Sequence, residues 1–159
     1  MKSPATPCMS GKSIAGVLVF VLIAGIIPAV PLHGQSDSPA ALGKTKSIAE
    51  TQHEIVILLI RQKEFQKALT EANKIFEMRW PEDQEPLLLK ALLTISGEFI
   101  RQGQAGFGLQ AIDGNSRFFK KLPSQIALWK EKGYLYKGMN QNEKAIDCFR
   151  KAQELEDRK

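Results

Sequence analysis

The chain of 159 residues is long enough for one ordinary domain, and its 22 basic and 17 acidic side chains give a net charge of +5. This small excess argues against a nucleic-acid-binding protein, because such proteins carry a clustered basic face. The sequence has two histidines and two cysteines. It has neither the spacing of a zinc site nor a glycine-rich phosphate loop, so we expect no metal, nucleotide or other cofactor.

The first 34 residues have the composition of a targeting segment. Two lysines precede fourteen consecutive apolar residues at positions 14–27, which suits a signal-peptide core and is short for a membrane span of about 20 residues. Cleavage is expected after Gly34. The alternative is an uncleaved anchor, because the apolar segment reaches nineteen residues when it is counted from 14 to 32.

Both alternatives send the rest of the chain across a membrane, since the two lysines stay on the near side. We therefore expect an exported protein that is free in a bacterial periplasm, anchored in the inner membrane facing the periplasm, or secreted. Membrane contact is expected only through residues 14–32, and only if they are retained. Without residues 1–34 the chain has 20 basic and 17 acidic residues, a net charge of +3. Cys148 is then the sole thiol, and we expect it to be buried; a disulfide between two chains is the alternative.

Residues 35–46 are rich in serine, proline, glycine and threonine, and they predict a flexible linker. From residue 47 to 159, apolar residues recur at steps of three and four, which predicts a helical domain with short turns. The expected helices cover 47–61, 65–78, 83–102, a glycine-rich stretch between 103 and 123, 124–137 and 140–158. We expect the fourth helix to be irregular near its start and closed by Pro123. Asn140 and Glu143 resemble a capping box at the start of the sixth helix.

The last predicted hairpin has small residues where two helices would touch and large residues beside them. Counted from Ile126, positions 4, 8, 11, 20, 24 and 27 are Trp129, Gly133, Tyr136, Ala145, Phe149 and Ala152. This pattern resembles the tetratricopeptide repeat (TPR), in which the small residues let paired helices approach closely. The resemblance implies a surface that binds another protein, and not an active site.

Two earlier units resemble the same repeat less closely. The unit 49–80 places Ala68 at position 20, and the unit 90–123 places Gly97 at position 8 but Leu109 at the alanine position 20. With the last unit at 126–157, the sequence predicts an all-α protein, a short α-solenoid of about three TPR-like helical hairpins. The alternative is a six-helix bundle without a superhelical groove.

The sequence does not place a nucleophile, a base or paired carboxylates at a spacing that is typical of an active site, so we expect no enzymatic activity. The resemblance implies a partner-binding face formed by the first helix of each hairpin. Carried over by register, the candidate binding residues are His53, Ile57, Ile60, Arg61, Glu98, Arg101, Lys130, Tyr134 and Lys137. Residues 55–60 are six aliphatic residues in a row, and some must lie outside a single core stripe. We therefore expect glutamate at Ile57 and Ile60 to weaken complex formation more than folding.

Lys130, Tyr134 and Lys137 are expected to hold an acidic or C-terminal segment of a partner through charge-assisted hydrogen bonds. The alternative is that the two lysines only keep this face soluble. The sequence thus predicts a non-enzymatic adaptor or assembly factor of the cell envelope. A structural homo-oligomer that pairs through its terminal helices is the second hypothesis.

Overall fold

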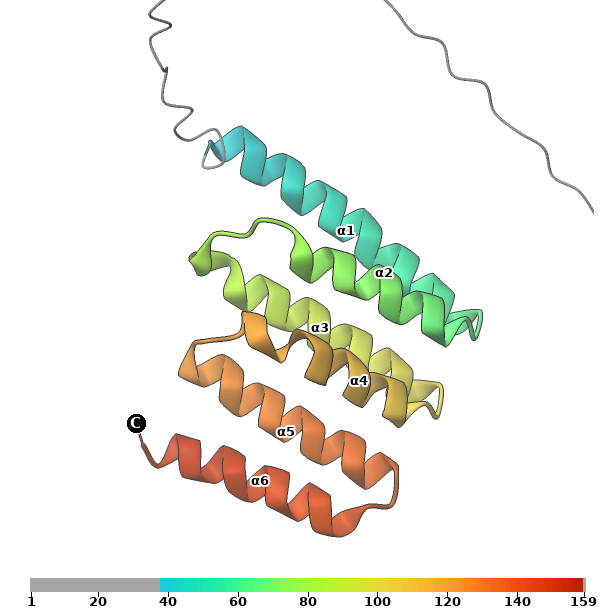
Figure 1. The fold of residues 1–159 in the computed structure, drawn as a ribbon, viewed down its shortest axis with the longest axis vertical. Helices are drawn as coiled ribbons and strands as arrows, with labels where there is room; N and C mark the ends of the chain where they lie inside the picture. Colours follow the sequence, from blue (N-terminus) through green and yellow to red (C-terminus); the bar gives the residue numbers. More distant parts are fainter. Residues whose placement is uncertain (1–37, 159) are drawn as a thin grey trace, which may run out of the picture. The chain divides into compact units, whose positions relative to one another are not determined.

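The computed structural model describes residues 38–158 and shows an all-α fold in them, which confirms the predicted class (Figure 1). The described residues form six α-helices and two short 3-10 helices. These are α1 (Pro39–Arg61), α2 (Phe65–Glu77), η1 (Glu82–Gln84), α3 (Glu85–Arg101), α4 (Ala105–Asn115), η2 (Ser116–Phe118), α5 (Leu122–Gly138) and α6 (Asn142–Glu156). The predicted targeting segment and the first residues of the predicted linker lie outside the described residues.

The helices pair in chain order as hairpins, α1 with α2, α3 with α4 and α5 with α6 (Figure 1). We call these hairpins 1, 2 and 3. Each hairpin packs on the next, because α1 contacts α3, α2 contacts α4, and α5 contacts both α3 and α4. The first helices of the hairpins therefore contact one another in series, and this series forms the face on which the candidate residues were expected.

The first helix begins eight residues earlier than predicted, so residues 39–46 are helical and the linker prediction is wrong for them. Ser38 supplies the N-cap, since its Oγ accepts a hydrogen bond from the Ala41 backbone N–H at 3.2 Å. Pro39 occupies the first turn, where its fixed φ suits a helix and its missing N–H costs nothing. The polar, breaker-rich composition that suggested a linker is thus the start signal of a helix.

The three hairpin turns have the same backbone geometry. Lys63, Gly103 and Asn140 have φ values of 64°, 69° and 59°, in the left-handed region. In each turn this residue donates its N–H to the carbonyl three residues back, and the next residue donates to the carbonyl five residues back. This pair of bonds is the Schellman motif that ends helices. Asn140 therefore ends α5, and the predicted capping box is wrong, because α6 begins at Asn142.

The repeated turn fixes which residues of the three hairpins are equivalent. Hairpins 1 and 2 are offset by 40 residues, and hairpins 1 and 3 by 77 residues, judged from the left-handed residue of each turn. The small pair at the helix crossing is then Val56 with Ala68, Ser96 with Gly108, and Gly133 with Ala145. Placing Leu109 at the alanine position was therefore wrong by one residue, and the register of the whole middle unit moves by one.

Glycine is required at two of these crossings. A Cβ at Gly108 would lie 2.6 Å from Leu135 Cδ2 and 3.4 Å from Ser96 Oγ, and a Cβ at Gly133 would lie 2.5 Å from Phe149 Cε1. Both positions are in contact with another helix at closer than normal van der Waals distance for a side chain. The middle hairpin thus has a close approach of two helices at Gly108, which the placement of Leu109 at position 20 had excluded.

The fourth helix is irregular at its end and not at its start. It runs regularly over Ala105–Asn115 and then tightens into η2. Asn115 is buried there, and its Nδ2 donates to Ala111 O at 2.9 Å and to Asn73 Oδ1 of α2 at 3.0 Å. The prediction that Pro123 closes this helix is wrong, because Pro123 lies in the first turn of α5.

The main apolar core extends through hairpins 1 and 2 and into α5. Phe65 of α2 lies between the two hairpins, with its ring centroid 6.2 Å from that of Phe99 and 5.4 Å from that of Phe107. A smaller cluster formed by Ile126, Ala152 and Leu155 packs inside hairpin 3. Within residues 38–158, no helix combines the length and the apolarity that crossing a membrane requires.

Candidate functional site

A buried glutamate holds two arginines at one end of the first helices. Glu98 of α3 is 2% exposed. Its Oε1 accepts a hydrogen bond from Arg61 Nε at 3.1 Å, and its Oε2 accepts one from Arg101 Nε at 2.9 Å and another from Arg101 Nη2. The side chains of Arg61 and Arg101 are 59% and 62% exposed. We call Arg61 and Arg101 the arginine pair.

The arginine pair carries a net charge of +1 after Glu98 is counted. The hydrogen bond from Arg101 lowers the pKa of Glu98 most, burial raises it, and the hydrogen bond from Arg61 lowers it further, so that the pKa lies below its ordinary value. Glu98 is therefore ionised at neutral pH. Within residues 38–158 Arg61 donates to Glu98 only through Nε, and its two Nη groups have no hydrogen-bond partner there.

The two arginines occupy equivalent positions in consecutive hairpins. Arg61 is the last residue of α1 and Arg101 the last residue of α3, 40 residues apart. A cation in the last turn also interacts favourably with the helix dipole. The equivalent residue of hairpin 3 is Gly138, so the arginine pair is limited to hairpins 1 and 2.

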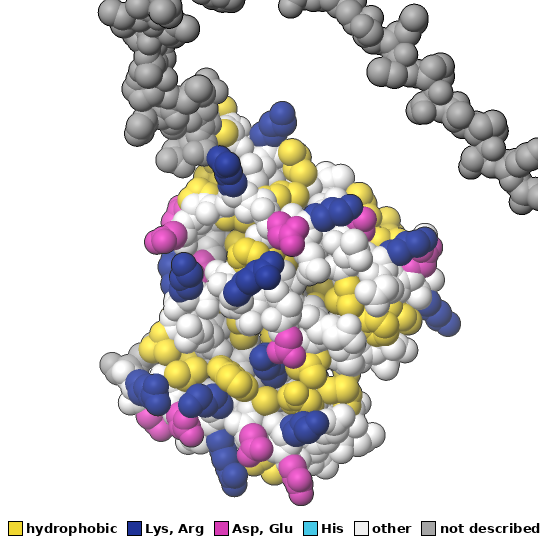
Figure 2. Space-filling model, viewed as in Figure 1, with side chains coloured by type: hydrophobic (Ala, Val, Ile, Leu, Met, Phe, Trp, Pro, Cys, Tyr) yellow, Lys and Arg dark blue, Asp and Glu magenta, His cyan; other side chains and the backbone are white. Residues whose placement is uncertain are grey.

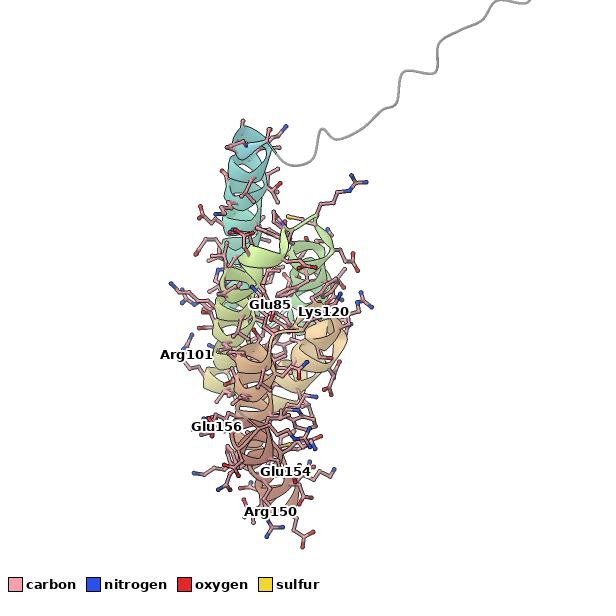
Figure 3. The ribbon with its side chains drawn as sticks, turned by 90° about the vertical axis from the view of Figure 1, so that its left-hand side faces the viewer. Glu85, Arg101, Lys120, Arg150, Glu154 and Glu156 are labelled. Atoms are coloured by element: carbon pink, nitrogen blue, oxygen red, sulfur yellow. The ribbon has the colours of Figure 1, made fainter. Side chains whose placement is uncertain are left out.

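An accessible stripe on α3 leads to Arg101. Lys90, Thr94, Gly97 and Arg101 are spaced by four, three and four residues, which puts them on one face of the helix, and none of them is buried. A Cβ at Gly97 would meet only Arg101 Nη1, at 3.9 Å. Figure 3 shows Arg101 on the same side of the helices as Glu156. This stripe and the arginine pair form an elongated basic and polar surface.

Two of the predicted binding residues belong to the core. Ile57 is 6% exposed and Ile60 is fully buried. Their placement on the binding face was wrong, because α2 and α3 both pack on α1 and both residues belong to the main apolar core. The expectation that glutamate at these positions spares folding is wrong for the same reason: a buried charge without a partner is strongly destabilising.

His53 is partly buried as well. Its side chain is 20% exposed, with Nδ1 3.8 Å from Glu54 Oε1, and its Nε2 is buried without a hydrogen-bond partner in the described residues. This residue offers a partner little accessible surface. Of the predicted residues in hairpins 1 and 2, the structure thus brings together Arg61, Glu98 and Arg101, and it excludes the other three from the exposed site.

The three predicted residues of α5 belong to hairpin 3. Lys130 Nζ is 2.6 Å from Glu156 Oε1 of α6. Tyr134 is 55% exposed, and its ring meets that of Phe149 edge-on at a centroid distance of 5.3 Å. Lys137 is exposed. With an offset of 77 residues, these three positions are equivalent to His53, Ile57 and Ile60 of α1.

A cleft between two helix connections was not predicted from the sequence. It has a volume of about 540 Å³ and lies between the α2–α3 and α4–α5 connections. Its lining includes Phe76, Trp80, Phe118, Glu77, Glu82, Glu85, Arg117, Lys120 and Lys121. The only signal for it in the sequence is the segment 117–121, in which three basic residues flank two phenylalanines.

Glu85, which lines this cleft, links α3 to the connection between α4 and α5. Its carboxylate accepts the backbone N–H groups of Lys120 at 3.3 Å and Lys121 at 3.0 Å, and Figure 3 shows Glu85 and Lys120 near each other. Burial raises the pKa of Glu85, but hydrogen bonds from Ser124 and from both N–H groups outweigh it and leave the pKa below its usual value. The carboxylate is therefore used in a structural contact between α3 and the α4–α5 connection.

The described residues offer no group of three or more His, Cys, Asp or Glu side chains that would hold a metal ion. Cys148 is buried, and burial raises the pKa of its thiol, which makes it a poor nucleophile. Figure 2 shows lysine, arginine and acidic side chains interspersed over the viewed face, with apolar side chains between them. The surface in this view has no contiguous basic field of the kind that binds nucleic acid.

Comparison of the chain with protein families, curated proteins and solved structures finds no match in any of the three.

Proposed function

We propose that this protein is a non-enzymatic adaptor of the TPR type, exported to the cell envelope, that binds an acidic segment of a partner protein. The observation that carries this proposal is the arginine pair, which Glu98 fixes in place while most of both side chains stays exposed. A guanidinium that is already held loses less side-chain entropy on binding a carboxylate than a free one.

The TPR assignment is supported by the turns and the helix crossings. All three turns share one hydrogen-bond pattern, and hairpins 2 and 3 each have a small pair at the crossing, Ser96 with Gly108 and Gly133 with Ala145. The assignment to the cell envelope rests on the apolar segment at residues 14–27. Recovery of the native chain from the cytoplasmic fraction alone would contradict this second part of the proposal.

Site-specific photo-cross-linking in the producing cells tests the binding site. A photoreactive phenylalanine analogue at Thr94, on the accessible stripe, is expected to capture one dominant partner, which mass spectrometry identifies. Replacing both arginines (Arg61→Gln with Arg101→Gln) is expected to reduce this cross-link by about ten-fold or more, since each charge-assisted pair contributes one to several kcal/mol.

The matched control removes the same charge elsewhere. Lys67 and Arg150 are exposed and paired only with neighbours on the surface, so Lys67→Gln with Arg150→Gln lowers the net charge equally. The cross-link at Thr94 is expected to persist in this control. An unchanged cross-link in the arginine variant, or an equal loss in the control, would overturn the assignment of the arginine pair.

A further inference from the structure

Exposed apolar side chains gather at the two ends of the series of hairpins. Six large apolar residues of the described chain are exposed. Three of them, Ile48, Ile55 and Leu58, lie on α1; two, Tyr134 and Ile146, lie on α5 and α6. The first three form the N-terminal patch, and Tyr134 and Ile146 with the partly buried Phe149 form the C-terminal patch.

The N-terminal patch occupies positions that other hairpins use for packing. Ile48, Ile55 and Leu58 are 41% to 53% exposed, whereas their equivalents in α3, which are Leu88, Ile95 and Glu98, are at most 5% exposed. The equivalent of Leu58 in α5 is Leu135, which is fully buried. In the described chain α3 and α5 each follow another hairpin and α1 does not, so the exposure of the patch reflects a missing neighbour.

The C-terminal patch shows the complementary difference. Tyr134 and Ile146 are 55% and 48% exposed, and their equivalents in hairpin 1, which are Ile57 and Leu69, are 6% and 8% exposed. Hairpin 1 is covered at these positions by the hairpin that follows it. Within residues 38–158 no hairpin follows hairpin 3.

The contact between hairpins 2 and 3 shows how such ends fit together. Leu135 of α5 lies against Gly108 of α4, beside Ser96 of α3. In hairpin 3 the residues equivalent to Gly108 and Ser96 are Ala145 and Gly133. The Cβ of Ala145 fills space that Gly108 leaves open, so Leu58 of a second copy, which is equivalent to Leu135, would lie further from hairpin 3 than Leu135 lies from hairpin 2.

The charges at the two ends are complementary as well. Glu131 of α5 accepts a hydrogen bond from Ser96 of the preceding hairpin at 2.7 Å. The equivalent of Glu131 in α1 is Glu54, whose side chain is 75% exposed. On a docked copy it would lie over α5 near Gly133, within reach of Lys137 and of Lys130, which also pairs with Glu156. Both lysines lie within one helical turn of this place.

We propose that copies of this chain stack end to end, with the N-terminal patch of one copy on the C-terminal patch of the next. Such an interface joins two different surfaces, so it continues into a longer assembly or closes into a ring. The series of hairpins within one chain is repeated across the interface between chains. The proposal does not depend on the arginine pair, which lies outside both patches.

Disulfide trapping in the full chain tests this arrangement. With Cys8 and Cys148 replaced by alanine, single cysteines are placed at Leu58 and at Ile146 in two separate variants. Because the two patches meet each other, a disulfide-linked dimer is expected when both variants are produced together, and not when either is produced alone. A cysteine at Thr70, exposed on α2, replaces Leu58→Cys as the matched control and is expected to give no dimer with Ile146→Cys.

Other outcomes overturn the proposal. Dimers of the Leu58→Cys variant alone would show that two α1 helices pair with each other. The absence of a disulfide-linked dimer between the two variants would also overturn the proposal. A photo-cross-link from Leu58 to a different protein, or to residues 1–37 of the same chain, would show another occupant. Sedimentation velocity of the full chain in detergent gives an independent readout, in which Leu58→Glu is expected to weaken association by about ten-fold or more. A circular dichroism spectrum equal to that of the unmodified chain checks that this exposed substitution leaves the fold intact.

Discussion

Gly108 of α4 lies so close to Leu135 of α5 that a Cβ at this glycine would be 2.6 Å from Leu135 Cδ2. Leu135 is fully buried. This contact joins hairpin 2 to hairpin 3. It shows that the middle hairpin uses a glycine where the other two use alanine, because a leucine of the following helix needs the room.

A pair of glycine substitutions in α4 tests this contact. Gly108→Ala is expected to lower the free energy of unfolding by up to about 2 kcal/mol, because an overpacking cost of about 1–3 kcal/mol is offset by a gain of about 1 kcal/mol in helix propensity. Gly114→Ala, in the same helix with nothing within 4 Å of the added Cβ, is expected to raise it by up to about 1 kcal/mol. Urea unfolding followed by circular dichroism measures both. Equal stabilisation by the two substitutions would mean that Leu135 does not pack on Gly108.

Replacing Glu98 by leucine is expected to separate stability from binding. The equivalent residues of α1 and α5 are both leucine, so the position accepts this side chain. Substitution of a buried ion pair by an apolar residue is often neutral or stabilising by about 1–4 kcal/mol, and the exposed arginines can turn to solvent. We therefore expect an unchanged or higher unfolding midpoint in urea.

Partner capture by the Glu98→Leu variant is expected to fall, since nothing then holds the arginine pair in place. The photo-cross-link from Thr94 measures this loss, and the Lys67→Gln, Arg150→Gln control sets the reference. A variant that unfolds more easily but captures the partner normally would contradict both halves of this prediction.

The class of the fold and the places of the helices could be predicted because they follow from the local spacing of apolar residues. The start of α1 was missed, since Ser38, Pro39 and Gly43 suggest a linker as readily as a helix start. Deciding between the two depends on the capping contact of Ser38, which composition does not reveal. The middle register was missed because Gly97 was matched to position 8, which places Leu109 and not Gly108 at position 20; the contact with Leu135 corrects it.

The candidate site could be predicted only in part. Arg61, Glu98 and Arg101 were selected by register and do lie together. Ile57 and Ile60 could not be assigned, because in a run of six aliphatic residues every helix face is apolar, and the covered face is decided by α2 and α3. Long-range packing of this kind is not encoded in the spacing within α1.

Acid is expected to destabilise the helical domain through Glu98 and Glu85. Both carboxyl groups have a pKa below the ordinary value of about 4.3 in the folded chain, so on acidification the unfolded state takes up protons first. Their contribution to stability is complete above about pH 5–6 and is lost as the pH falls through the lowered pKa of each group. Urea midpoints measured between pH 7 and pH 3 are expected to fall steeply below about pH 5.

The Glu98→Leu variant is the control for this pH dependence. It lacks one of the two groups, so its decline in stability below pH 5 is expected to be shallower than that of the unmodified chain. The difference belongs to Glu98, because Glu85 remains bonded to the Lys120 and Lys121 N–H groups. An identical dependence of the urea midpoint on pH in the two proteins would show that Glu98 does not form an ion pair with the two arginines.

The left-handed residues of the turns give the last prediction. Lys63 and Gly103 occupy the same position, with φ values of 64° and 69°, and only glycine adopts this conformation without a steric cost of about 1–2 kcal/mol. Lys63→Gly is therefore expected to raise the free energy of unfolding by up to about 1 kcal/mol, partly offset by the entropy of the unfolded chain, and Gly103→Ala to lower it by about 1–2 kcal/mol. A Cβ at Gly103 would meet nothing within 4 Å, so a loss there reports the backbone and not a clash. Urea unfolding of both variants provides the measurement. A loss of stability for Lys63→Gly, or a gain for Gly103→Ala, would show that the two turns do not share one geometry.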